Sequence, residues 1–263
     1  MSSAEVEIGA FGFEQAVEAI AVQSRRLAEA VAMSDLDAIV PSCPGWSVRD
    51  LAHHIGRGQS FWSENVRAKT EDVMSEWTSD PYPEDSDLPA WLGSCTYSLL
   101  RALRDTGPDA PCWTWWPHTK PHTSGAVARH HVQEVAVHRW DAELASAGLP
   151  GPLPAAVATD GVAEFLDIML GSSAATLTGQ VTLKATDTGD SWRIRAFDVP
   201  EDPDDLDDLE RPDGPDQATR WAEVRAAVSD LVLVLYRRLP IHDAFVRGDL
   251  TLVASLLSGA NTE

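Results

Sequence analysis

The first half of the chain carries apolar residues at helical spacing. Between Phe13 and Met33 the apolar positions recur every three or four residues, which predicts an amphipathic helix. Four such segments are expected, over residues 13–33, 48–68, 88–104 and 125–147. Ser47 is suited to cap the second segment, because Asp50 follows three residues later and favours the positive end of the helix dipole. Four helices of this length indicate an antiparallel four-helix bundle.

The pattern changes after the sequence Leu-Pro-Gly-Pro at residues 149–152, where we expect a domain boundary. The second half is expected to contain helices at 154–170, 230–238 and 248–257, a β-hairpin of 181–185 with 192–196, and a strand at 219–224. The predicted fold class is therefore a two-domain α+β protein. Its bundle domain covers residues 1–149, and a smaller α+β domain covers residues 150–263.

Composition narrows the classes of function. The chain has 263 residues, 44% of them hydrophobic, and a formal net charge of −21. Such a charge excludes a nucleic-acid partner bound by phosphate neutralisation and disfavours an anionic membrane surface. No apolar run reaches the roughly 18 residues that span a bilayer, and the first residues do not resemble a signal peptide. With only three cysteines, a disulfide framework is not expected, and we predict a cytoplasmic protein.

Two further stretches differ in composition from the rest of the chain. Residues 201–216 are strongly acidic, and without metal-ligand spacing they predict a solvated surface loop. Three of the ten tryptophans, Trp113, Trp115 and Trp116, lie in an expected long loop at 106–124. Such residues either fill gaps between helices or form the rim of a pocket, and the sequence leaves both interpretations open.

The fourth predicted helix contains a pair of residues able to bind a metal ion. Glu134 and His138 are four positions apart, so their side chains lie one turn apart on one face. A carboxylate and an imidazole in this arrangement can share a divalent cation. The same spacing is also typical of a surface ion pair or a cap.

A third candidate ligand comes from the second predicted helix. His54 is flanked by Leu51 and Ile55 and is therefore expected to point inward. A buried histidine needs a polar partner, and a metal ion shared with Glu134 and His138 would supply it. Two alternatives remain at this stage: a core histidine bound to a carbonyl group, or His53 as the inward residue.

Three blocks of sequence resemble the mycothiol-dependent maleylpyruvate isomerase family. Residues 40–54, VPSCPGWSVRDLAHH, are similar to the family pattern P-x-C-P-G-W-x-V-x-D-L-x-x-H. Residues 134–141, EVAVHRWD, are similar to its pattern E-x-x-x-H-R-x-D. A looser third block combines residues 231–238 with Arg247-Gly248-Asp249. The resemblance implies that the N-terminal domain is a DinB-like four-helix bundle that binds a metal ion.

The same resemblance assigns roles to individual residues. It implies that His54, Glu134 and His138 are the metal ligands, and that Arg238 is a catalytic residue that holds a substrate carboxylate. The family has Gly-Arg where this chain has Arg237-Arg238, so Arg238 is equally interpreted as a cation at a helix C-terminus. Asp141 is either a partner of His138 or an exposed acid. Cys43 and Cys112 have no apparent base that would make them nucleophiles.

The resemblance also implies a chemistry. Two imidazoles and a carboxylate leave coordination positions open, and Zn²⁺ is the leading candidate for the divalent metal. Mycothiol is expected as co-substrate, because a metal ion lowers the pKa of a bound thiol. The expected activity is isomerisation of an unsaturated keto acid such as maleylpyruvate, or thiol transfer to another electrophilic small molecule. The alternatives are a hydrolase that uses metal-bound water and a non-catalytic metal-binding protein.

Overall fold

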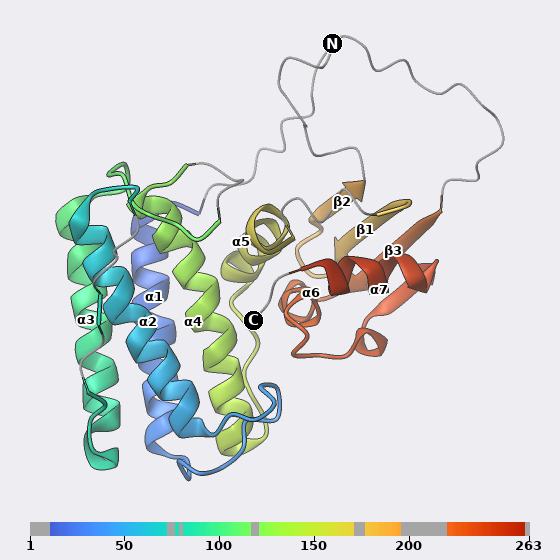
Figure 1. The fold of residues 1–263 in the computed structure, drawn as a ribbon. Coiled ribbons are helices and arrows are strands. Elements are labelled where there is room, and N and C mark those ends of the chain that lie inside the picture. Colours follow the sequence, from blue (N-terminus) through green and yellow to red (C-terminus); the bar gives the residue numbers. More distant parts are fainter. Residues whose placement is uncertain are drawn as a thin grey trace. The chain divides into compact units, whose positions relative to one another are not determined.

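The fold was analysed in a computed structural model of the chain, which is drawn in Figure 1. The structure describes residues 11–72, 77–78, 81–116, 121–170, 177–195 and 220–260. This part of the chain contains seven α-helices and a four-stranded sheet, which confirms the α+β class. None of the helices described is both long and apolar enough to cross a membrane.

Four long helices form most of the first half of the chain. They are α1 (Phe13–Ala32), α2 (Val48–Ala68), α3 (Leu88–Thr106) and α4 (Ser124–Ala147). Each begins and ends within two residues of the predicted position. In the structure α1 packs against α3 and α4, and α2 packs against the same two helices, so the four lie side by side. The helices that bear the candidate ligands, α2 and α4, are thus direct neighbours.

Helix α4 is buried on nearly every side. Its apolar residues are not confined to one stripe, and polar side chains such as Gln133, Arg139 and Asp141 are buried with them. A buried charged group needs partners. Arg139 donates to Glu143 at 2.7 Å, to the carbonyl of Gly151 at 2.6 Å and to Gln23 at 3.1 Å. These contacts join α4 to α1 and to the segment that follows it.

A tight turn leads into α2 and positions Trp46. The amide of Val40 donates to the carbonyl of Trp46 at 2.9 Å, and Gly45 takes a positive φ of 85° that favours glycine. Ser47 then caps α2: its side chain accepts from the amide of Asp50, and the Asp50 carboxylate accepts from the amide of Ser47 at 2.9 Å. The predicted capping is confirmed, and it fixes the start of α2 relative to the turn.

The second half of the chain contains the sheet, whose strand order is β2-β1-β3-β4. Strands β1 (Gln180–Ala185) and β2 (Ser191–Arg195) form the predicted antiparallel hairpin. Strand β3 (Trp221–Ala226) pairs with β1 in parallel, and β4 (Phe245–Gly248) pairs with β3 antiparallel. The sequence analysis missed β4, which has only four residues and lies at the edge of the sheet, where one neighbour suffices.

The helices of this half are α5 (Ala155–Glu164), α6 (Val228–Leu235) and α7 (Leu250–Gly259). The expected helix at 154–170 is confirmed, and its second part, Phe165–Leu170, is a π-helix that follows α5 without a break. Helix α6 ends three residues before the predicted end, and Arg237 takes a left-handed φ of 60° directly after it. The predicted acidic loop at 201–216 lies outside the described residues.

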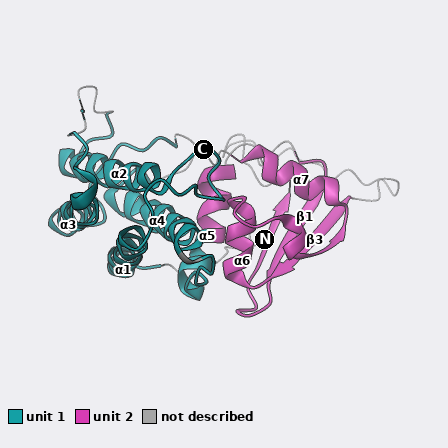
Figure 2. Ribbon diagram, turned by 90° about the horizontal axis from the view of Figure 1, so that it is seen from below, with its two compact units in different colours: residues 1–161 teal, residues 162–263 magenta. Residues whose placement is uncertain are grey.

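The chain divides into two compact units, residues 1–161 and 162–263 (Figure 2). The division falls inside α5, which is later than the expected boundary at residues 149/150. Residues 150–161 are therefore grouped with the helical unit, partly through the bonds from Arg139 and through Arg129, which pairs with Asp160 at 2.9 Å. The assignment of two domains at 1–149 and 150–263 stays a prediction.

Candidate metal centre

The structure brings His54, Glu134 and His138 together. Nε2 of His54 lies 2.7 Å from Oε1 of Glu134, and Nε2 of His138 lies 3.8 Å from the same oxygen. One potential ligand atom from each residue lies within 4.8 Å of the others. Glu134 stands between the two imidazoles, as expected for residues that share one cation.

The choice between the two adjacent histidines of α2 is settled by their neighbours. His54 contacts Glu134, whereas His53 stacks on Tyr82 with ring centroids 3.7 Å apart and meets Trp91 edge-on at 6.1 Å. The expectation that His54 is buried is wrong, since its side chain is 41% exposed. Leu51 and Ile55 are buried as expected, so His54 lies at the border of the core rather than within it.

The side chain of His138 is more buried than that of His54 and has a buried hydrogen-bond partner. Its side chain is only 9% exposed, and its Nδ1 lies 2.9 Å from Oδ2 of Asp141, which is fully buried. An ionised carboxylate only accepts hydrogen bonds, so Nδ1 of His138 carries the proton. Nε2 is then left with its lone pair, on the side of Glu134. This is the tautomer that a metal-binding histidine needs.

Asp141 is itself held by the turn before α2. The hydroxyl of Ser42 donates to Oδ1 at 2.5 Å, and the thiol of Cys43 donates to Oδ2 at 3.3 Å. Of the two interpretations of Asp141, the buried partner of His138 is therefore the one observed. Cys43 is engaged with that carboxylate, and burial raises the pKa of the Cys112 thiol to about 12. The Cys112 thiol therefore stays protonated at neutral pH and does not have the environment of an activated nucleophile.

Trp46 covers the two histidines from the same turn. Its ring stacks on His138 at an angle of 17° and lies 4.8 Å from the ring of His54, measured between centroids. Trp46 thus contacts two candidate ligands, and Ser42 and Cys43 hold Asp141, the partner of His138. The only signal of these contacts in the sequence was that Ser42, Cys43 and Trp46 lie in one short motif.

The electrostatics favour an ionised Glu134. Desolvation opposes this, but the hydrogen bond from His54 and the nearby His138 together lower the pKa of Glu134 well below its usual value. One turn earlier on α4, His131 is 1% exposed and neither ring nitrogen has a partner among the described residues. Burial lowers the pKa of His131 to about 4, which keeps this ring neutral.

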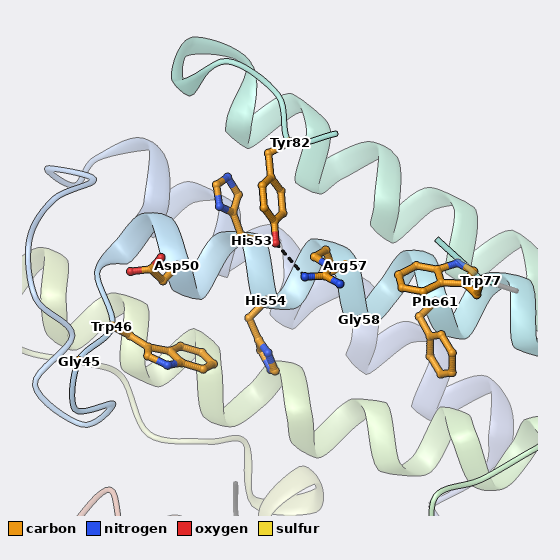
Figure 3. Close-up of a pocket in the computed structure, with 10 residues that line it drawn as sticks. All are labelled: Gly45, Trp46, Asp50, His53, His54, Arg57, Gly58, Phe61, Trp77 and Tyr82. Carbon is orange, nitrogen blue, oxygen red and sulfur yellow. Dashed lines mark hydrogen bonds between the residues drawn. The ribbon is translucent and has the colours of Figure 1, made fainter. Parts of the chain in front are cut away.

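A pocket opens beside His54. It has a volume of ≈ 580 Å³, and its lining includes Trp46, His54, Arg57, Trp77 and Tyr82 (Figure 3). This size lies within the range of pockets that bind small molecules. Trp46 and Trp77 line the pocket, whereas Trp113 packs against Trp62 with centroids 6.1 Å apart. Trp113 therefore packs on α2 and is not among the residues that line this pocket.

Arg238 belongs to the other compact unit. It follows α6, and its Nη1 donates to the carbonyl of Tyr236 at 2.9 Å. A cation that binds the last carbonyl groups of a helix is one of the two interpretations offered by the sequence. The contact of Arg238 with a substrate carboxylate stays a prediction. Within the described residues, a second possible ligand set consists of Cys43, His138 and Asp141.

Comparison with known proteins supports the family that the sequence resembles. Residues 17–143 match the family described as the mycothiol maleylpyruvate isomerase N-terminal domain. No curated protein gives a significant match. Two crystal structures are similar in fold: a mycothiol-dependent maleylpyruvate isomerase and a variant of it with one histidine replaced by alanine. Each is 13% identical, covers 89% of this chain and 90% of its own, and has a TM-score of 0.56.

Proposed function

We propose that this chain is a metal-dependent enzyme that activates a low-molecular-weight thiol for addition to an electrophilic small molecule. The observation that carries the proposal is the convergence of His54, Glu134 and His138 within 4.8 Å, beside a pocket of ≈ 580 Å³. The match to this family supports the same chemistry, because the similar isomerase depends on mycothiol.

The three side chains fit a divalent cation such as Zn²⁺. Two imidazole nitrogens and one carboxylate oxygen are ligands that Zn²⁺ accepts, and three protein ligands leave a position open. His138 has the required tautomer because Asp141 accepts the proton of Nδ1. When bound, the cation would lower the pKa of a coordinated thiol and so supply a thiolate near neutral pH.

The residues of the chain provide the surroundings for that thiolate. His54 is the most exposed of the three ligands and lines the pocket, so the thiol and the electrophile would enter on its side. Trp46 lines the same pocket and covers His138 by stacking on its ring. Exclusion of water strengthens the electrostatic interactions inside such a site.

For an unsaturated keto acid, the thiolate adds to the activated double bond and the resulting single bond rotates. Elimination then restores the double bond in the trans form and returns the thiol, so no oxidant or reductant is needed. With an electrophile that carries a leaving group, the same thiolate would complete a thiol transfer. Isomerisation of a maleylpyruvate-like acid is our first candidate, because the similar structures are those of a maleylpyruvate isomerase.

The test compares the zinc-loaded and the metal-free protein. Each is incubated with mycothiol and a cis-unsaturated keto acid, and in parallel with ester and amide substrates without thiol. Thiol- and metal-dependent formation of the trans acid would support the proposal. Hydrolysis without thiol would favour the hydrolase, and tight metal binding without turnover of any substrate would favour a metal-binding protein.

A further inference from the structure

One face of α2 forms the floor of the pocket. Asp50, His54, Arg57 and Phe61 recur at helical spacing along it and all line the pocket (Figure 3). Side chains three positions apart on a helix have Cβ atoms about 5–6 Å apart. Arg57 is therefore the next neighbour of the candidate ligand His54 along this face.

The guanidinium of Arg57 is held in place by an aromatic residue. Its Nη1 donates to the hydroxyl of Tyr82 at 3.1 Å, which the dashed line in Figure 3 marks. The Tyr82 ring stacks on His53 at 3.7 Å between centroids, so the tyrosine is itself positioned by α2. These contacts orient Arg57 without neutralising its charge.

Arg57 differs from the other two arginines of α2 in its lack of a carboxylate partner among the described residues. On the same helix Arg49 pairs with Asp37 and Asp85, and Arg67 pairs with Glu64. Arg57 pairs with no carboxylate among the residues that the structure describes. Asp50, the acid that lines the pocket, is engaged in the cap with Ser47 at 2.6 Å.

The pocket is also open at Gly58, the residue that follows Arg57. Gly58 lines it directly after Arg57, and a Cβ atom built on Gly58 would meet nothing within 4 Å. A guanidinium has five N–H donors in a planar fork that suits a carboxylate, and the Tyr82 hydroxyl engages one of its nitrogens. The other donors of Arg57 are available to a ligand.

We propose that Arg57 binds a carboxylate of the electrophilic substrate beside the metal centre. A small acid would reach both the thiolate and Arg57, because His54 and Arg57 lie one helical turn apart. The reaction of the bound acid with a thiol rests on the proposed function. The binding of a carboxylate by Arg57 does not. Electrophiles that carry a carboxylate would then be preferred, and Arg57 on α2 would be the residue that determines this preference.

The first experiment measures binding without chemistry. Succinate, a saturated diacid that cannot add a thiol, is titrated calorimetrically into the zinc-loaded protein and into two variants, Arg57→Gln and Arg57→Lys. Loss of a charge-assisted pair weakens binding by about 10–100-fold, so Arg57→Gln should show this loss and Arg57→Lys a smaller one. Arg67→Gln, an arginine of the same helix paired with Glu64, is the matched control and should bind as the unchanged protein does.

Two results of the titration would overturn the proposal. One is equal affinity of the unchanged protein and Arg57→Gln, which would mean that the metal alone binds the diacid. The other is no binding to the unchanged protein. Circular dichroism of each variant separates these results from misfolding, since an exposed arginine is not expected to carry the fold.

The second experiment compares two electrophiles, maleate monoamide and its neutral methyl ester, with mycothiol as the thiol. Arg57→Gln should lower the ratio of kcat/KM for the acid to that for the ester by about 10–100-fold, mainly through KM. An equal loss on both electrophiles would contradict the assignment. If the unchanged protein converts neither one, the thiol chemistry fails, and the succinate titration still decides the role of Arg57.

Discussion

The two helices that form the candidate metal centre present it with opposite surroundings. Helix α4 supplies Glu134, whose side chain is 30% exposed, and His138, whose side chain is only 9% exposed, and the fully buried Asp141 holds the His138 ring. Helix α2 supplies His54, whose side chain is 41% exposed and borders an open pocket. For the proposed metal centre, the difference supports a division of roles, in which α4 would fix the cation and α2 would admit what reacts there.

The division has a physical basis in the cost of burial. Polar groups on α4 are removed from water and must find partners inside the protein, which makes their positions definite. Those on the pocket face of α2 remain accessible and keep donors available for a ligand. Substitutions on α4 should therefore affect stability and metal binding together, whereas those on the exposed face of α2 should affect metal and substrate binding alone.

The largest effect on stability is expected from Arg139, the buried cation of α4. Arg139→Met breaks a buried ion pair, leaves Glu143 with Arg26 as its remaining cation, and removes the donor to Gln23 and to the Gly151 carbonyl; breaking a buried pair typically costs about 3–5 kcal/mol. Urea denaturation measures the loss. Arg25→Met, which breaks an exposed pair with Glu29, is the control and should cost below about 1 kcal/mol. Equal losses of unfolding free energy in Arg139→Met and Arg25→Met would contradict the contrast between buried and exposed positions.

On the open side, we expect His54→Ala to abolish stoichiometric metal binding with little change in the helical circular-dichroism signal. The side chain is partly exposed and provides one of three ligands, so its loss removes a bond to the metal and little packing. Metal content after dialysis against zinc measures the effect. His53→Ala is the matched neighbour and should retain the metal. Full metal content in His54→Ala would refute the assignment of this ligand.

We expect the stability of the protein to depend on pH through His131, a buried residue of α4. Desolvation lowers the pKa of His131 to about 4 from an unfolded value near 6.5, so the unfolded state binds the proton more tightly. Above pH 6.5 the His131 ring is neutral in both the folded and the unfolded state. As the pH falls from about 6.5 to 4, the unfolded state takes up a proton that the folded state does not, and the free energy of unfolding decreases.

His131→Leu should therefore flatten the stability curve of the metal-free protein between pH 6.5 and 4, by up to a few kcal/mol at the acid end. Urea denaturation at a series of pH values gives the slope. Measurement at pH 8, where the ring is neutral in both states, separates this effect from any change in packing. The account of His131 fails if both proteins lose stability equally on acidification.

A smaller effect is expected from the carboxylate behind His138. Asp141→Asn removes the charge that stabilises the Nδ1–H tautomer of His138, and loss of such a partner weakens metal affinity by about 10–100-fold. Competition with a chelator measures the affinity, and nitrogen chemical shifts of the metal-free protein report the tautomer. Asp50→Asn, at the cap of α2, should leave both unchanged. An unaltered tautomer in Asp141→Asn would contradict the role of this residue.

The sequence predicted the helices well because their signals are local. Ser47 with Asp50 defined the start of α2, and the apolar spacing located the other three long helices. The edge strand β4 was missed because four residues carry too little pattern, and its pairing with β3 depends on contacts distant in the sequence. The π-helical turn after α5 has no signal in the spacing of apolar residues.

For the candidate site, the sequence indicated the residues but not their surroundings. The resemblance selected His54, Glu134 and His138, and the structure brings these three together. No pattern could show that Ser42 and Cys43 bind Asp141, since nearly 100 residues separate them. The exposure of His54 was misjudged because its apolar neighbours Leu51 and Ile55 suggested a core position. Arg57 and Tyr82 are 25 residues apart in the sequence and meet only in the folded chain, where both line the pocket.

The most direct test of the account is a crystal of the zinc-loaded, thiol-free protein, with anomalous diffraction collected on both sides of the zinc edge. We expect one peak at about 2.0–2.2 Å from Nε2 of His54, a carboxylate oxygen of Glu134 and Nε2 of His138. A peak bound instead by Cys43, His138 and Asp141, or zinc bound elsewhere with the three side chains uncoordinated, would contradict it.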